Sequence, residues 1–179
     1  MPRLLLALAA LVVPAAIAAL AADRLLAARR AGRAPEPLRM LEVVDAPIER
    51  TWEVVADIPR QPDWMHEMKA VRIVSPGPVV EGTRAEATVR ILGIGVTDPV
   101  TITTIEPPTR YAIRHEGLFT GGGVITLEAG ADGTTTIIRW DETLVPPLLP
   151  ELGSRLQAPI LRAIFQADLR HLKRLVEAG

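Results

Sequence analysis

The sequence predicts an α+β domain in which an antiparallel sheet is covered by one long C-terminal helix, preceded by a hydrophobic N-terminal segment. Three observations support this prediction. Residues 4–22 are uncharged, residues 69–144 alternate strand-like runs with short turns, and apolar residues recur at helical spacing from residue 161 onward. Because such a sheet has a face to bury, the terminal helix is its expected cover.

The run Leu4–Ala22 contains 19 residues and no charge. As a helix it would extend about 28 Å, close to the hydrocarbon thickness of a bilayer. We therefore expect residues 1–23 to form an uncleaved membrane anchor and residues 24–37 a basic linker. Two alternatives stay open: a cleaved secretory signal, since Ala19 to Ala21 resembles a cleavage site, and a buried core helix.

Arginines on one side of this run predict its orientation. Arg24, Arg29, Arg30 and Arg33 follow the run, whereas only Arg3 precedes it. Positive side chains stay in the cytoplasm, so we expect a single-pass membrane protein with its body on the cytoplasmic side. These arginines either contact anionic lipid headgroups or serve only as topology signals.

The body, residues 38–179, is expected to begin with the strand Leu38–Val44. A helix should follow from Pro47, because proline suits a first helical turn, and should end near Pro59. A turn or second short helix is expected through Gln61–Met65. Six further strands are predicted from alternation and turn signals, at Lys69–Ser75, Thr83–Leu92, Val96–Glu106, Arg110–Glu116, Gly123–Glu128 and Thr134–Leu144.

The last part of the chain has the pattern of an amphipathic helix, which Pro159 either starts or kinks. Its apolar stripe is expected to pack on the concave face of the sheet. The stripe consists of Leu161, Phe165, Leu169, Leu172 and Val176.

Composition limits the classes of function. The 179 residues are 49% hydrophobic and carry a net charge of −1, which excludes a disordered chain and argues against a nucleic-acid binder. The sequence has no cysteine, so disulfides, cysteine-ligated metals and thiol nucleophiles are excluded. We expect no metal and no cofactor, because the three histidines are isolated.

Glycine clusters give no nucleotide-binding motif. Gly93-Ile94-Gly95 lacks the third glycine of a dinucleotide fingerprint, and Gly121–Gly123 lacks the Lys-Ser/Thr of a phosphate loop. We interpret the first cluster as a turn and the second as a bent or close-packed strand.

Strand alternation places a set of side chains on one face of the sheet. If Ile138 and Trp140 point inward, Glu142 does too, and Tyr111 shares a face with His115. An apolar pocket with a few converging polar groups is typical of small-molecule sites. The candidate cavity residues are Ala87, Val89, Ile91, Tyr111, Ile113, His115, Ile125, Leu127, Ile138, Trp140, Glu142 and Phe165.

Each polar candidate also has a structural interpretation. Glu142 lies near a strand end and would reach solvent at a bulge, which we weigh slightly ahead of a ligand role. His115 would be a rim residue, and Tyr111 a core ring with its hydroxyl satisfied. Trp140 is the aromatic residue that best fits a cavity wall, because it belongs to the sheet.

Several stretches resemble the START-like, or SRPBCC, superfamily, which includes polyketide cyclase/dehydrase-like proteins. They are VVDAPIERTWEVVADIPRQPDW, GTRAEATVRILG, TTIEPPTRYAIRHEG, GTTTIIRWDETLVPP and ILRAIFQADLRHLKRLVE, and the resemblance covers the body, residues 38–179. The resemblance implies a helix-grip fold, as in START and Bet v 1-like proteins. It also implies a deep cavity for lipids, sterols, quinones, hormones or polyketides.

Two functions of different classes follow. The favoured one is a membrane-tethered protein that binds a hydrophobic small molecule, such as a lipid, quinone or polyketide-like compound, without chemistry. The alternative is a cyclase or dehydratase with Glu142 or His115 as general base and Tyr111 as acid. Weaker alternatives are a cleaved, secreted binding protein and a domain that only recruits a protein partner.

Overall fold

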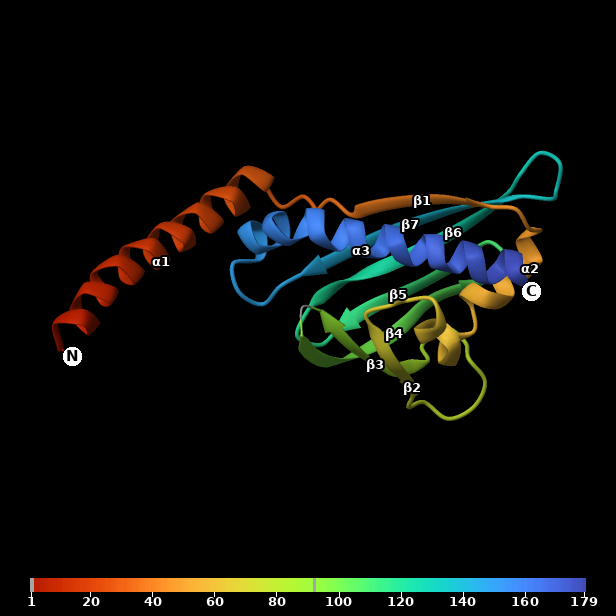
Figure 1. Cartoon of the computed structure of the whole chain (residues 1–179), viewed down its shortest axis with the longest axis horizontal. Helices are drawn as coiled ribbons and strands as arrows, with labels where there is room; N and C mark the ends of the chain where they lie inside the picture. Colours follow the sequence, from red (N-terminus) through yellow and green to blue (C-terminus); the bar gives the residue numbers. More distant parts are fainter. Residues whose placement is uncertain (1, 92) are drawn as a thin grey trace.

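The computed structural model describes residues 2–91 and 93–179, with side chains from residue 11 onward in those ranges. An N-terminal helix, α1 (Pro2–Arg30), projects from one end of the body (Figure 1). The body contains one seven-stranded sheet, two short helices and a long C-terminal helix. Leu92, which the sequence assigned to a strand end, lies outside the described residues.

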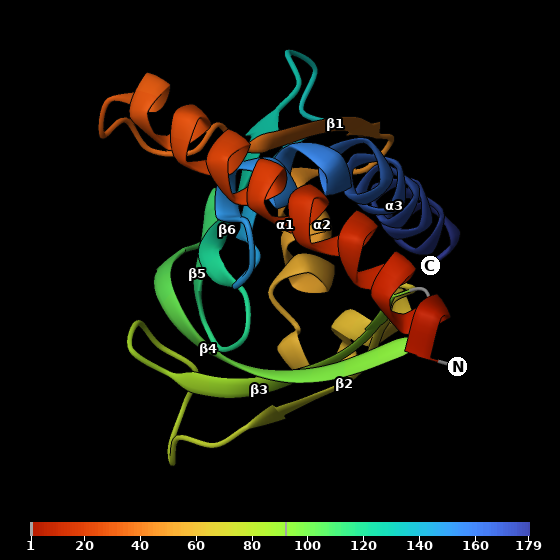
Figure 2. The same ribbon diagram turned by 90° about the vertical axis from the view of Figure 1, so that its left-hand side faces the viewer.

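All neighbouring strands of the sheet are antiparallel, in the order β1-β7-β6-β5-β4-β3-β2. The sheet curves around the last helix (Figure 2). All seven predicted strands are present, and the glycines of residues 121–123 extend one of them toward Thr120. The strands are β1 (Leu38–Val44), β2 (Met68–Ile73), β3 (Arg84–Ile91), β4 (Ile94–Glu106), β5 (Arg110–Glu116), β6 (Thr120–Ala129) and β7 (Thr136–Val145).

Two short helices, α2 (Ile48–Val55) and η1 (Ile58–Asp63), lie between β1 and β2. Pro47 is the N-cap residue of α2. Pro59 lies in the first turn of η1 and separates the two helices, because its fixed φ and missing N–H prevent α2 from continuing through it. Trp64 follows η1 and is fully buried.

The C-terminal helix α3 (Pro150–Ala178) covers one face of the sheet (Figure 1). It begins nine residues before Pro159, so this proline lies inside the helix and does not start it. Leu169, Leu172 and Val176 of the predicted stripe are fully buried in the core. Phe165, which also belongs to the predicted stripe, is only partly buried, because one side of its ring borders a cavity. The stripe is therefore not packed against the sheet along its whole length.

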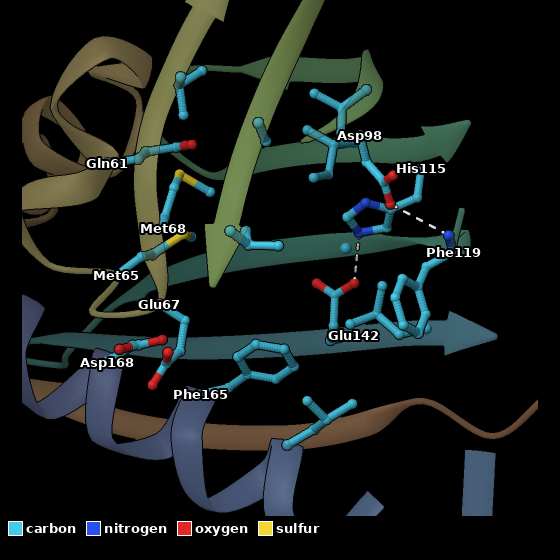
Figure 3. Close-up of a pocket in the computed structure, with 18 of the residues that line it drawn as sticks. Gln61, Met65, Glu67, Met68, Asp98, His115, Phe119, Glu142, Phe165 and Asp168 are labelled. Atoms are coloured by element: carbon cyan, nitrogen blue, oxygen red, sulfur yellow. Dashed lines mark hydrogen bonds and ion pairs between the residues drawn. The ribbon is translucent and has the colours of Figure 1, made fainter. Parts of the chain in front are cut away.

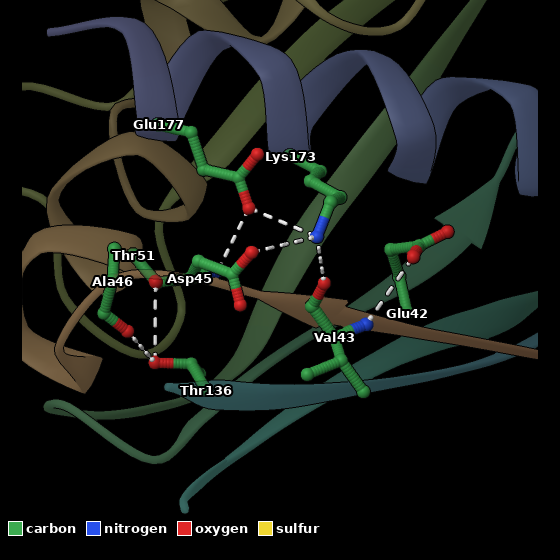
Figure 4. Close-up of polar contacts among 8 residues, drawn as sticks. All are labelled: Glu42, Val43, Asp45, Ala46, Thr51, Thr136, Lys173 and Glu177. Carbon is green, nitrogen blue, oxygen red and sulfur yellow. Dashed lines mark hydrogen bonds and ion pairs between the residues drawn. The ribbon is translucent and has the colours of Figure 1, made fainter. Parts of the chain in front are cut away.

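Polar contacts fix the C-terminal end of α3 to β1 (Figure 4). The Lys173 ammonium donates to the Val43 carbonyl at 2.6 Å and pairs with Glu177 at 2.9 Å, and Glu177 accepts from the Asp45 N–H at 2.7 Å. Beneath them, the buried Thr136 hydroxyl donates to the Ala46 carbonyl at 2.7 Å. The helix is thus held by directed bonds as well as by its apolar stripe.

The helix α1 continues through residues 24–30, which the sequence assigned to a linker, because they include good helix formers such as leucine, alanine and arginine. It ends where Ala31 and Gly32 adopt positive φ angles. The segment Leu11–Arg30 has the length and apolar composition of a membrane span or of a signal sequence.

The end of α1 contacts the start of α3. The Asp23 carboxylate accepts hydrogen bonds from the backbone N–H groups of Glu151 and Leu152, at 2.9 and 2.8 Å. It therefore caps the N-terminus of α3, where free N–H groups need acceptors. The Arg30 guanidinium adds an ion pair to Glu151 at 2.7 Å.

Candidate ligand cavity

A cavity of about 350 Å³ lies between the concave face of the sheet and α3. Its wall is mostly aliphatic and comes from strands β2 to β7, α3 and the segment around η1. Small side chains at Ala85 and Ala87 keep the β3 side open. Such a cavity has the size and the apolar character of small-molecule sites.

Most residues predicted from strand alternation line this cavity, because alternation brings every second side chain to the same face. Leu127 and Ile138 do not: both point to the same face but are fully buried in the core, where the helices close over the sheet. The predicted residues that line it are Ala87, Val89, Ile91, Tyr111, Ile113, His115, Ile125, Trp140, Glu142 and Phe165.

Three polar side chains from two strands meet in the wall of this cavity, and Figure 3 shows the contact between two of them, His115 and Glu142. The Glu142 carboxylate, 3% exposed, lies 2.9 Å from Nε2 of His115 through one oxygen. Its other oxygen accepts from the Trp140 indole N–H, also at 2.9 Å. We call Glu142, His115 and Trp140 the polar triad.

The geometry of the triad defines its available atoms. A carboxylate only accepts, so in a contact with a carboxylate Nε2 of His115 is the donor. Nδ1 of His115 makes no hydrogen bond with any residue that the structure describes. In the neutral ring this nitrogen is an acceptor that a ligand hydroxyl can use.

Gly123 makes the triad possible. It pairs with Glu142 across β6 and β7, and a Cβ on Gly123 would collide with the carboxylate. The run Gly121–Gly123 is therefore a close-packed strand segment. Gly121 adopts a positive φ, and a Cβ there would collide with the Thr143 carbonyl.

The structure corrects two expectations about the polar candidates. Glu142 does not reach solvent at a bulge, because β7 pairs with β6 through Val145 without interruption and turns the side chain inward. His115 is not a solvated rim residue: its side chain is 16% exposed and paired with Glu142.

Tyr111 lies deep in the cavity wall and is 5% exposed. Burial raises the pKa of its phenol to about 12, and a hydrogen bond with Gln61 opposes part of this rise. An acid with such a pKa is poorly matched to proton donation near neutral pH. Tyr111 therefore suits a hydrogen-bonding role better than the general-acid role considered from sequence.

Sequence reasoning missed several polar lining residues. Asp98 lies on β4 and accepts hydrogen bonds from the N–H groups of Leu118 and Phe119, at 2.9 and 3.3 Å. It holds the β5–β6 turn, and a Cβ on Gly117 would collide with it. Alternation along β4 was the signal that identifies Asp98, since it shares a face with Val100 and Ile102.

The opposite end of the cavity contains Asp168 and Glu67 (Figure 3). Asp168, on α3, is 3% exposed and accepts a hydrogen bond from the His66 N–H at 2.9 Å. Burial raises its pKa to about 6, and the neighbouring charge of Glu67 adds to the effect. Its position one residue before Leu169 gave no sign that it faces the cavity.

The cavity opens at the end of the body from which α1 projects. Among the lining residues that the structure describes, Ile94 and Ile160 are the exposed ones, and they lie near the β3–β4 turn and in the first half of α3. Leu118, Leu148 and Leu156 are exposed at the same end, where the β5–β6 turn and the β7–α3 connection lie (Figure 1). We call Ile94, Leu118, Leu148, Leu156 and Ile160 the apolar mouth.

In the part of the chain that the structure describes, no group of three histidine, cysteine or acidic side chains is arranged to hold a metal ion. The polar groups in the cavity wall include the polar triad, the Tyr111 hydroxyl and the buried carboxylates of Asp98 and Asp168. These groups donate and accept hydrogen bonds.

A family model described as polyketide cyclase / dehydrase and lipid transport matches residues 40–177. No curated protein matches the chain. An aromatase/cyclase from a Streptomyces species is 18% identical with a TM-score of 0.64, and the match covers 79% of this chain and 93% of that one. A protein from Deinococcus radiodurans is 21% identical with a TM-score of 0.60, covering 80% and 98%. These structures share the helix-grip fold with the body.

Proposed function

Since the chain belongs to the polyketide cyclase/dehydrase and lipid transport family, we propose that it binds a largely apolar small molecule with at least one polar oxygen. The cavity between sheet and α3 is the site. The observation that supports this is the contrast within its wall: most of the lining is aliphatic, and a buried polar triad is set into it. Apolar surface supplies the affinity, and a few placed polar groups orient the ligand.

The proposal includes a membrane tether. In it, α1 is a single-pass anchor and the body lies on the cytoplasmic side, as the arginines after the apolar run favour. The apolar mouth lies at the end of the body next to α1, and Leu148 is 81% exposed there. A mouth rimmed by leucine and isoleucine beside an anchor suits a ligand, such as a lipid, quinone or polyketide-like compound, that enters from the bilayer.

A second candidate function is a cyclase or dehydratase. The specific observation that favours it is the pairing of His115 with Glu142, because a carboxylate that orients a histidine leaves the other ring nitrogen available as a general base. Solved structures of the same fold include aromatase/cyclases. In this mechanism Glu142 positions His115, and Tyr111 donates a hydrogen bond to a substrate oxygen.

The test of binding is mass spectrometry of apolar molecules that co-purify with the detergent-solubilised full chain. Ala87→Phe places a ring in the cavity and should remove the molecule. Ala70→Phe makes the same change at an exposed position of β2 and should leave it in place. Equal recovery from the wild type, Ala87→Phe and Ala70→Phe would show that the molecule sits elsewhere.

Glu142→Gln separates the two candidate functions. The glutamine amide keeps the shape of the side chain, and its oxygen can still accept the hydrogen bond from Trp140. Its NH₂ group cannot accept a hydrogen bond from His115 as the second carboxylate oxygen does. Binding without chemistry predicts retained ligand and no product. If a polyketide-like substrate is converted by the wild type but only bound by Glu142→Gln, the enzyme alternative replaces the favoured one.

Topology has its own test. A reporter enzyme that works only in the cytoplasm should be active when it is fused after Gly179. A reporter that works only outside the cytoplasm should be inactive at the same position. A reporter active only outside the cytoplasm, or a mature N-terminus near Ala22, would overturn the tether.

A further inference from the structure

A second cavity, of about 460 Å³, lies where α1, the segment 31–37 and the first half of α3 meet β7. We propose that this cavity, the arginine pocket, binds the phosphate of an anionic ligand, and that the ligand is the headgroup of an anionic phospholipid. The lipid source rests on the proposed membrane tether. The phosphate chemistry rests on the arginines alone.

Five arginines line this pocket, and they come from distant parts of the chain. Arg29, Arg30 and Arg33 belong to the end of α1 and the turn after it, whereas Arg155 and Arg162 lie two turns apart on α3. Arginine binds phosphate oxygens through parallel N–H donors, so convergent arginines are the usual protein partners of that group.

Acidic neighbours neutralise only part of this charge. Glu151 is paired with Arg30 at 2.7 Å, and Glu142, which reaches the pocket wall, is paired with His115. Glu36 is exposed. The other four arginines form no ion pair with the described residues.

The position of the pocket points to a lipid. The Asp23 cap holds α1 against α3, so the arginines lie at the end of the apolar run, at the level expected for headgroups if α1 spans the bilayer. The pocket also shares Glu142, Leu144, Gln157 and Leu161 with the apolar cavity. A lipid phosphate in the pocket would leave its chains beside the apolar mouth.

The experiment is native mass spectrometry of the full chain in a non-ionic detergent, titrated with dioleoyl phosphatidylglycerol. In one variant Arg33, Arg155 and Arg162 are replaced by glutamine. In a control, Arg110, Arg170 and Arg174, which are exposed and lie outside both cavities, receive the same change. We expect the first variant to bind the lipid on the order of 100-fold more weakly, since each arginine contributes about fivefold, and the control to match the wild type.

Two further arms identify the source of the phosphate. Dioleoyl phosphatidylcholine should bind more weakly than phosphatidylglycerol, and millimolar inorganic phosphate should not displace the latter. If inorganic phosphate displaces phosphatidylglycerol, the phosphate site is supported but a lipid as its specific ligand is contradicted. Equal phosphatidylglycerol binding by the two variants would overturn the site itself.

The proposed function is monitored separately in the same samples. The apolar molecule that co-purifies with the cavity should be retained by the arginine variant, because the three substituted side chains do not line that cavity. A wild-type chain that carries no apolar molecule but loses phosphatidylglycerol on substitution would refute the proposed function and leave the arginine pocket intact.

Discussion

Gly123 faces Glu142 across β6 and β7, and the side chain that Gly123 lacks is replaced by the Glu142 carboxylate. The carboxylate occupies the space of a Cβ, and there it reaches both His115 and Trp140. A glycine is therefore part of the cavity's polar chemistry without contributing a polar atom.

Gly123→Ala should displace the Glu142 carboxylate and break both triad hydrogen bonds. We expect a loss of about 1–3 kcal/mol in the free energy of unfolding, because a buried charge loses partners. Denaturant unfolding and the chemical shift of the Trp140 indole N–H measure the two effects. Gly95→Ala is the control, since a Cβ there meets open space. An unchanged indole signal in Gly123→Ala would contradict the triad geometry.

Tyr111 is the only tyrosine in the chain, so its ionisation can be followed by tyrosinate absorbance. The native phenol should titrate near pH 12, and the unfolded phenol near its ordinary value of 10. Because the folded pKa is raised, this group's contribution to stability is complete below pH 10 and is lost as the pH rises through 12. Titration of the folded protein near pH 10 would show that the hydroxyl is solvated.

Asp168 should make stability depend on pH in the acidic range. Its pKa rises from 3.8 to about 6 on folding, so its contribution is complete below pH 4 and is lost as the pH rises through 6. Asp168→Asn removes this titration and keeps an acceptor for the His66 N–H. The difference in melting temperature, Asp168→Asn minus wild type, should increase as the pH rises from 4 to 7. A constant difference across this range would exclude the raised pKa.

Two residues of the α3 stripe should respond differently to truncation. Leu169 is fully buried, so Leu169→Ala should cost about 2–5 kcal/mol. Phe165 contacts Trp140 at a ring-centroid distance of 4.9 Å but borders the cavity, so Phe165→Ala should cost less than the 3–5 kcal/mol typical of a buried phenylalanine. Urea unfolding of both variants measures the difference. A larger loss for Phe165→Ala would mean that the cavity is closed around the ring.

Asp23→Ala removes the cap that α1 provides to α3. We expect a local loss of about 0.5–2 kcal/mol, as for other helix caps. Hydrogen exchange at the amides of Glu151 and Leu152 should accelerate, because these amides donate to Asp23. Asp141→Ala, at an exposed position of β7, is the control and should leave both amides protected. Unchanged exchange in Asp23→Ala would mean that α1 moves independently of the body.

The elements of this fold were predictable because each has a local signal. Alternation over residues 84–91 and 136–145 and the stripe at residues 161–176 are periodic, and turns with glycine and proline separate them. Alternation also predicted which face Trp140 and Glu142 share. It did not predict where along that face the cavity ends, so Leu127 and Ile138 were placed in the wall instead of the core.

The rest depends on contacts between distant segments. Nothing near Glu142 indicates that His115 will hold its carboxylate, since this partner comes from another strand and the space for the contact comes from the glycine opposite. Asp23 and Asp168 likewise gain their roles from elements far along the chain. Such pairings need coordinates, because sequence periodicity assigns a side chain to a face but not to a partner.

The pairing of the first strand with the last has a consequence during synthesis. β1 is an edge strand of the sheet and pairs with β7, and α3, the last element in chain order, packs on it. During synthesis β1 is therefore made long before its partners β7 and α3, and the body closes only after α3 has been made. Long-range pairing of this kind slows folding. Chains that stop before Thr136 should accumulate as unclosed intermediates that chaperones hold and proteases remove.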